Sequence, residues 1–270
     1  MDIKTKKLNH MNSLKYFYGI IAIAGFTACE KETVGDDVTP ANTTREQVTT
    51  GLGGSMTQFT IMGDYLYTID YKTLNVFHLA DPSNPVELEN IDMGVGMETI
   101  FQNGNYLYIG AQDGVHIFDI TNPRSPLEVS EFEHVTSCDP VIANDEIAIA
   151  TLRGGTQCGG SLTELDIIDL SDINNPTLKY TTALINPYGL GFSQQNPNIV
   201  YVCDGYAGLK AYDITDDQNP ELVMEFEDIE AIDVISTAGN LLVVLSREGV
   251  YQFDATNPTE LTELSHISVQ

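Results

Sequence analysis

The sequence predicts an all-β fold, a five-bladed β-propeller built from four-stranded antiparallel blades. Three observations predict it: one stretch of sequence recurs five times, short apolar segments alternate with Gly, Asn and Pro clusters, and no segment has the apolar period of an amphipathic helix. The five copies can be aligned on the residue that closes the third strand. These residues are His78, Asp119, Asp169, Asp213 and Asp254, spaced by 41, 50, 44 and 41 positions.

Each copy contains four segments that read as strands. In the second copy we expect strands over residues 99–102, 106–110, 115–120 and 127–133. The second and third strands are almost continuously apolar, as in residues 241–245, so we expect them to be buried on both faces. The fourth strand alternates apolar residues with glutamates, which suits a half-exposed edge that resists pairing with other chains. Buried inner strands beside a charged outer strand are typical of a propeller blade.

The aspartate that closes the third strand precedes a turn in four of the five copies. An aspartate side chain at such a position accepts hydrogen bonds from backbone N–H groups one or two residues further on. Because it recurs at one place in the repeat, we expect it to be structural rather than catalytic.

Three copies carry a motif that resembles a known repeat. The motif spans residues 115–120 with Pro126, residues 165–170 with Pro176, and residues 209–213 with Pro220. It is similar to the LVIVD repeat of bacterial cell-surface propeller proteins, and the resemblance extends over about residues 56–270. The first copy departs from it with His78 in the aspartate position, and the last shortens its proline turn to residues 256–258. The resemblance implies a propeller at the cell envelope.

The N-terminus reads as a lipoprotein signal peptide over residues 1–28. Lysines precede a short apolar core at residues 16–25, which is too short to span a membrane. The sequence Phe26-Thr27-Ala28-Cys29 resembles a lipobox, so we expect cleavage before Cys29 and a lipid on its thiol. The polar residues 29–55 then form a flexible tether to the propeller at 56–270. We therefore expect an outer-membrane lipoprotein at the cell surface or the periplasmic face, held to the membrane by its lipid.

The charge and the motifs exclude several functions. Twelve Lys and Arg residues against 39 Asp and Glu give a net charge of -27, which disfavours nucleic acid as a partner. The sequence has no phosphate loop, no His-Glu-x-x-His, no calcium loop and no nucleophile elbow. We expect no cofactor, no metal and no catalytic residue.

One face of the predicted propeller is the candidate ligand face. The loops that cross between blades and the turns between second and third strands gather there around the axis. In the third copy, residues 153–161 interrupt the repeat with a Gly-rich insertion, and this asymmetry is what a specific site requires. The candidate residues are Glu98, Asp139, Arg153, Tyr188, Tyr206 and Glu230.

Two cysteines reach the same face in the third copy. Cys138 opens its first strand and Cys158 lies in its turn between the second and third strands, so we expect a disulfide between them. A metal site is the alternative, but His134 is the only histidine near Cys138. Cys203 is expected to be a buried thiol at a strand end.

These observations favour a non-enzymatic envelope propeller that binds a protein or glycan partner through its loop face. The alternative is a glycan-active enzyme, a hydrolase or lyase that uses carboxylates near the axis. Glu98, Asp139, Glu230 and Asp233 are the candidates for that chemistry.

Overall fold

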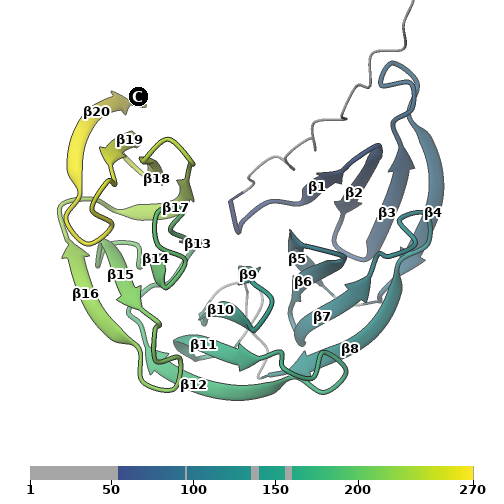
Figure 1. The fold of residues 1–270 in the computed structure, drawn as a ribbon, viewed down its shortest axis with the longest axis horizontal. Helices are drawn as coiled ribbons and strands as arrows, with labels where there is room; N and C mark the ends of the chain where they lie inside the picture. Colours follow the sequence, from purple (N-terminus) through teal and green to yellow (C-terminus); the bar gives the residue numbers. More distant parts are fainter. Residues whose placement is uncertain (1–53, 95, 135–139, 156–159, 270) are drawn as a thin grey trace, which may run out of the picture. The chain divides into compact units, whose positions relative to one another are not determined.

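The structure is a computed structural model, and it describes residues 54–94, 96–134, 140–155 and 160–269. All regular elements in these ranges are β-strands, and none of the described residues forms a helix able to cross a membrane. The strands make five antiparallel four-stranded sheets, and in every sheet neighbouring strands are consecutive in the chain (Figure 1). The chain is therefore a five-bladed β-propeller, as the repeat predicts.

The blades follow one another along the chain. Blade 1 contains β1 (Phe59–Met62), β2 (Tyr65–Ile69), β3 (Thr73–His78) and β4 (Val86–Asp92). Blade 2 contains β5 (Met97–Asn103), β6 (Tyr106–Ala111), β7 (Gly114–Asp119) and β8 (Leu127–Glu133). Blade 3 contains β9 (Val141–Ala143), β10 (Ile147–Arg153), β11 (Thr163–Asp169) and β12 (Thr177–Ala183). Blade 4 contains β13 (Leu190–Phe192), β14 (Ile199–Cys203), β15 (Leu209–Asp213) and β16 (Glu221–Phe226). Blade 5 contains β17 (Ala231–Ser236), β18 (Leu241–Ser246), β19 (Gly249–Asp254) and β20 (Thr262–Ser268).

The predicted aspartate turn after the third strand is present in blades 2 to 5. Asp119 accepts a hydrogen bond from the backbone N–H of Thr121 at 2.6 Å, and Asp213 accepts one from Thr215 at 2.8 Å. Hydrogen bonds from the side chain and then from the backbone of Thr121 and Thr215 lower the pKa of both carboxyl groups, because they stabilise the ionised form. Asp169 and Asp254 form the same turns. The structural interpretation of these aspartates is therefore confirmed.

The hydrophobic core is divided into four clusters, one at each junction between consecutive blades. At the junction of blades 1 and 2, for example, Leu74 and Val76 pack with Ile100, Leu107 and Phe118. Side chains also join the blades by hydrogen bonds. The hydroxyl of Tyr67 donates to the carbonyl of Pro123 at 2.9 Å, and the hydroxyl of Tyr201 donates to the carbonyl of Pro258 at 3.0 Å.

The inner strands of the end blades differ from the expectation of burial on both faces. In β6, β10 and β14 almost every residue is buried, whereas burial alternates along β18, where Leu245 is 44% exposed. On blade 1, burial likewise alternates along β2 and along most of β3. The physical reason is that no hydrophobic cluster of the described residues joins blade 5 to blade 1. An apolar run predicts two buried faces only where a blade has a neighbour on each side.

Candidate functional site

A cavity of about 530 Å³ opens on the face that carries the crossover loops. Residues from blades 1 to 4 line it. They lie before or at the start of a first strand, or near the turn between second and third strands. The lining residues are Met56, Gln58, Tyr71, Met97, Glu98, Thr99, Gln112, Pro140, Arg153, Pro187 and Tyr188. Its volume falls in the range of protein pockets that bind small molecules.

Arg153 is the last residue of β10 and begins the segment that interrupts the repeat. Its guanidinium carbon lies 4.1 Å from the centroid of the Tyr188 ring, so cation and ring are stacked. The Nε atom of Arg153 is buried and has no hydrogen-bond partner among the described residues. A buried charged donor without a partner is costly, and a ligand that brings an acceptor relieves that cost.

The backbone around Tyr188 is fixed by two neighbouring strands. The backbone N–H of Tyr188 donates to the carbonyl of Cys203 at 2.8 Å. The carbonyl of Tyr188 accepts a hydrogen bond from the Thr151 hydroxyl at 2.6 Å. Because β10 carries both Thr151 and Arg153, the same strand holds the backbone of Tyr188 and the cation that stacks on its ring.

A second arginine, Arg247, also interacts with Tyr188. Arg247, in the turn between β18 and β19, forms an ion pair with Glu230, its Nε 2.5 Å from the carboxylate oxygen. The Glu230 carboxylate and the Tyr188 hydroxyl both raise the pKa of Arg247, since both accept hydrogen bonds from the guanidinium. Glu230, Arg247, Tyr188 and Arg153 therefore form one connected group of side chains from blades 3, 4 and 5.

The chemistry of the lining suits binding. Glu98 is the only carboxylate among the described lining residues, and no His, Cys or Ser stands among them. A pair of carboxylates across the cavity, as glycoside hydrolysis uses, is therefore not formed by the described lining residues. The groups that are present are amides, hydroxyls, two phenol rings and one guanidinium.

Only some of the residues predicted for the ligand face line the cavity. Glu98, Arg153 and Tyr188 line the cavity. Glu230 is not a lining residue and is connected to the lining through Arg247 and Tyr188. Tyr206 is 66% exposed in the turn between β14 and β15. Asp139, together with the lipidation residue Cys29 and the predicted disulfide partners Cys138 and Cys158, lies outside the described residues.

Sequence reasoning missed Tyr71, Gln112 and Arg247. Each lies seven positions before the residue that closes the third strand of its blade, and Tyr206 has the same position in blade 4. This turn position varies from blade to blade while the closing residue is nearly constant. Variation at one position within a regular repeat was the available signal.

Asp233, considered above as an axial acid, is not part of the cavity lining. It lies on β17 against two glycines, and a Cβ atom at either Gly54 or Gly189 would lie 2.2 Å from one of its carboxylate oxygens. Burial raises the pKa of Asp233 to about 6, against the opposing hydrogen bonds from Val234 and Ser55. Its surroundings are those of a packed interior group.

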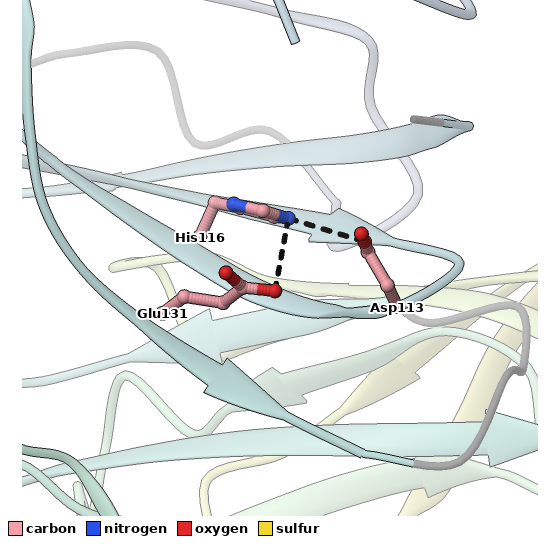
Figure 2. A group of neighbouring side chains, drawn as sticks. All are labelled: Asp113, His116 and Glu131. Carbon is pink, nitrogen blue, oxygen red and sulfur yellow. Dashed lines mark hydrogen bonds and ion pairs between the residues drawn. The ribbon is translucent and has the colours of Figure 1, made fainter. Parts of the chain in front are cut away.

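One cluster of described side chains could hold a metal ion. Asp113, His116 and Glu131 offer ligand atoms within 4.8 Å of one another, as Figure 2 shows. The Nε2 atom of His116 lies 3.1 Å from Asp113 and 3.7 Å from Glu131, while its Nδ1 atom lies 2.8 Å from Glu128. Burial lowers the pKa of His116, but the hydrogen bonds with Glu128 and Asp113 outweigh it and raise the pKa overall.

The position of this cluster in the repeat explains it without a metal. Three residues before the closing residue, every blade has a side chain paired with one on the fourth strand. The pairs are Asn75 with Asn90, His116 with Glu131, Asp166 with Thr181, Lys210 with Glu225, and Tyr251 with His266. Each blade thus has its own cross-strand pair, and the pair His116 with Glu131 is that of blade 2.

Comparison with known families identifies the repeat. The model described as the LVIVD repeat matches residues 53–93, 99–133 and 161–183, which lie in blades 1, 2 and 3. The chain therefore contains LVIVD repeats in blades 1, 2 and 3 of its β-propeller, as the motif in the sequence indicates. A comparison with curated proteins gave no match.

Solved structures share the fold. A protein from Lactobacillus plantarum matches with a TM-score of 0.59 and 14% identity over 76% of this chain and 68% of the other. A functionally unknown protein from Desulfotomaculum acetoxidans matches with a TM-score of 0.62 and 8% identity over 78% and 69%. The β-propeller domain of Cps50 (Swd1) from Myceliophteria thermophila matches with a TM-score of 0.57 and 12% identity over 77% and 71%. Identities this low show the common fold alone.

Proposed function

We propose that this propeller is a non-enzymatic binding protein of the bacterial cell envelope, which takes a protein or glycan partner in the cavity of Arg153 and Tyr188. The observation that carries the proposal is the buried Nε of Arg153, an arginine that lines a cavity. Within the described part of the chain this atom has no hydrogen-bond partner. A guanidinium held by stacking, with an unused donor, is prepared for an acceptor from outside the chain.

The other cations favour the same location. Of the twelve Lys and Arg residues, six lie at 54–269. Lys179 pairs with Asp169 and Asp217, Lys210 pairs with Asp204, and Arg247 pairs with Glu230. In a chain with a net charge of -27, a cation that contributes to a cavity wall marks where an acidic or acceptor group of a partner is attracted rather than repelled.

The envelope location is proposed from the sequence of residues 1–29. Cleavage before Cys29 and attachment of a lipid to its thiol would hold the protein on the outer membrane, at the surface or the periplasmic face. Mass spectrometry of the purified chain tests this directly. We expect an N-terminal fragment that begins at Cys29 and carries a diacylglycerol, and a Cys29→Ser variant that leaves the membrane fraction. An unmodified N-terminus on a protein that still sediments with membranes would contradict the assignment.

The binding proposal is tested with the full chain in detergent as bait for an envelope extract. We expect the wild-type chain and an Arg124→Gln variant to capture the same component, and an Arg153→Gln variant to lose it. Arg124 lies in the turn between β7 and β8, outside the cavity, so it controls for the loss of one positive charge. Equal capture by all three proteins would contradict the cavity as the binding site.

The enzymatic alternative is tested beside it. A panel of polysaccharides incubated with the full chain should show no turnover, because the described lining residues contain one carboxylate rather than a pair. Turnover that Glu98→Gln abolishes would establish the alternative.

A further inference from the structure

The stacking of Arg153 limits how a ligand can approach its guanidinium. The guanidinium carbon lies over the Tyr188 ring, so the ring covers one side of the cation and a ligand must reach it from another side. The edge that includes Nε can donate two parallel hydrogen bonds to a carboxylate. Among the described residues Nε has no hydrogen-bond partner, so this edge carries a donor that they leave unused.

The rest of the lining fits neutral polar groups rather than further charges. Gln58, Gln112, Thr99 and Tyr71 present amides and hydroxyls, which both donate and accept hydrogen bonds. An ionised Glu98 can accept hydrogen bonds but cannot donate them. It therefore favours a ligand with hydroxyl donors and repels a ligand carboxylate placed beside it. The Tyr71 ring is 58% exposed, which gives an apolar face on which a pyranose ring can stack.

The charge of the whole chain excludes densely acidic ligands. A net charge of -27 repels polyanions, so an acidic peptide or a polyphosphate approaches this surface against its field. A ligand that is neutral except for one carboxylate is repelled only weakly by the acidic chain, and its carboxylate can bind Arg153. An oligosaccharide with isolated acidic units has this composition.

We infer that the cavity binds an oligosaccharide in which a uronic acid stands among neutral sugars, with the uronate carboxylate on the edge of Arg153 and ring hydroxyls on Glu98, Gln58 and Gln112. This inference rests on the proposed function and names the ligand class of the same cavity. Tyr188 acts in it by holding the plane of the Arg153 guanidinium.

The test uses matched pairs of saccharides. Each pair consists of an oligosaccharide with one glucuronate or galacturonate among neutral hexoses or pentoses, and the same oligosaccharide with that carboxyl reduced to the alcohol. Affinities of the full chain in detergent are measured by titration calorimetry. For at least one pair we expect binding of the acidic member and a loss of about 10- to 100-fold for the reduced member, the range expected for charge-assisted hydrogen bonds.

Variants separate recognition from folding. Arg153→Gln is expected to bind the two members of the pair equally weakly, and Arg153→Lys is expected to restore only part of the difference, because an ammonium lacks the paired donors. Arg124→Gln is expected to behave as the wild type. Thermal unfolding of each variant is recorded, and the comparison is made between variants that unfold as cooperatively as the wild type.

Three results overturn the inference. They are equal affinity for the acidic and reduced members, an acidic preference that survives Arg153→Gln, and capture of a peptide instead of a saccharide. If no saccharide binds while the chain still captures an envelope component in an Arg153-dependent way, the ligand class is wrong and the proposed function stands. If neither occurs, both fail.

Discussion

The guanidinium of Arg153 stacks on the ring of Tyr188, with the central carbon 4.1 Å from the ring centroid. Arg153 ends a strand of blade 3, whereas Tyr188 lies on the crossover that leads to blade 4. Their contact therefore joins the segment that breaks the repeat to the next blade. It also fixes the one cation of the described cavity lining, so the geometry of ligand contact depends on an interaction between two blades.

The ring of Tyr188, rather than its hydroxyl, is predicted to support binding. Tyr188→Ala removes the stacking partner and is expected to weaken binding of the captured partner by about 2- to 30-fold, the range of cation–π energies. Tyr188→Phe keeps the ring and loses only its hydroxyl contact with the exposed Arg247, so we expect a change of about twofold or less. Equal losses in the two variants, measured by titration calorimetry, would show that the ring contact is not the supporting interaction.

Asp233 is predicted to make stability depend on pH in the acid range. Its pKa is raised to about 6 by burial, above the ordinary 3.8, so the unfolded chain releases this proton at lower pH than the folded chain. Stability contributed by the protonated group is therefore lost as the pH rises from about 4 to about 6 and stays constant above.

Replacement by asparagine removes this titration. Asp233→Asn is expected to be more stable than the wild type above pH 6, by about 3 kcal/mol, and nearly as stable near pH 4. Urea unfolding at pH 4, 5, 6 and 7 measures the difference. The matched control is Asp228→Asn, which replaces an exposed aspartate close by in the chain and is expected to follow the wild type. A difference independent of pH would contradict the buried titration.

His116 is predicted to make the protein less stable as the pH rises, whereas an acid with a lowered pKa makes it more stable. Its folded pKa is raised by Glu128 and Asp113 despite burial, so the stability of its charged form is complete below about pH 6.5, the ordinary histidine value. This stability is lost as the pH rises through the folded pKa. Between pH 6 and 8 the wild type should therefore lose stability more steeply than His116→Gln.

A second histidine controls for this effect. His78, half-buried at the end of β3, lies against Tyr65 with ring centroids 5.1 Å apart, and His78→Gln should keep the wild-type slope. Urea unfolding at three pH values gives the slopes. Parallel curves for the wild type and His116→Gln would show that the charged cluster in Figure 2 does not stabilise blade 2.

The cysteines are predicted to behave differently. Cys203 is buried on β14, and burial raises the pKa of its thiol well above the ordinary value, so alkylating reagents should modify it only after unfolding. Cys138 and Cys158 are predicted to form a disulfide, and a peptide map without reduction should link them. A link between Cys158 and Cys203 would contradict both the pairing and the burial of Cys203.

The sequence predicted the blades well because their determinants are local. Apolar strand residues, turn residues and the closing aspartate of each copy lie within one blade, so the period of the repeat is enough to place the strands. The two faces of β18 were not predicted, because the exposure of Leu245 depends on which sheets adjoin blade 5. That is a relation between distant parts of the chain.

The site was predicted only in part, because some of its contacts lie within one segment and others join different blades. Arg153 was found because its segment breaks the repeat, and Tyr188 because it lies in a crossover loop. Tyr71 and Gln112 were missed, although the Tyr71 hydroxyl lies 3.5 Å from the Gln112 side-chain oxygen across two blades. Such a contact depends on how the blades are placed, which the spacing of motifs does not determine.

The central claim is that a partner's acidic group binds on the edge of Arg153, within the cavity that Tyr188 borders. The most direct test is a crystal structure of the full chain with the component captured from the envelope. We predict an acceptor oxygen of that component within hydrogen-bond distance of the Arg153 Nε, with the guanidinium still stacked on Tyr188. A partner bound instead along the outer strands β4, β8, β12, β16 or β20, with the Arg153 Nε still without an acceptor, would contradict the account.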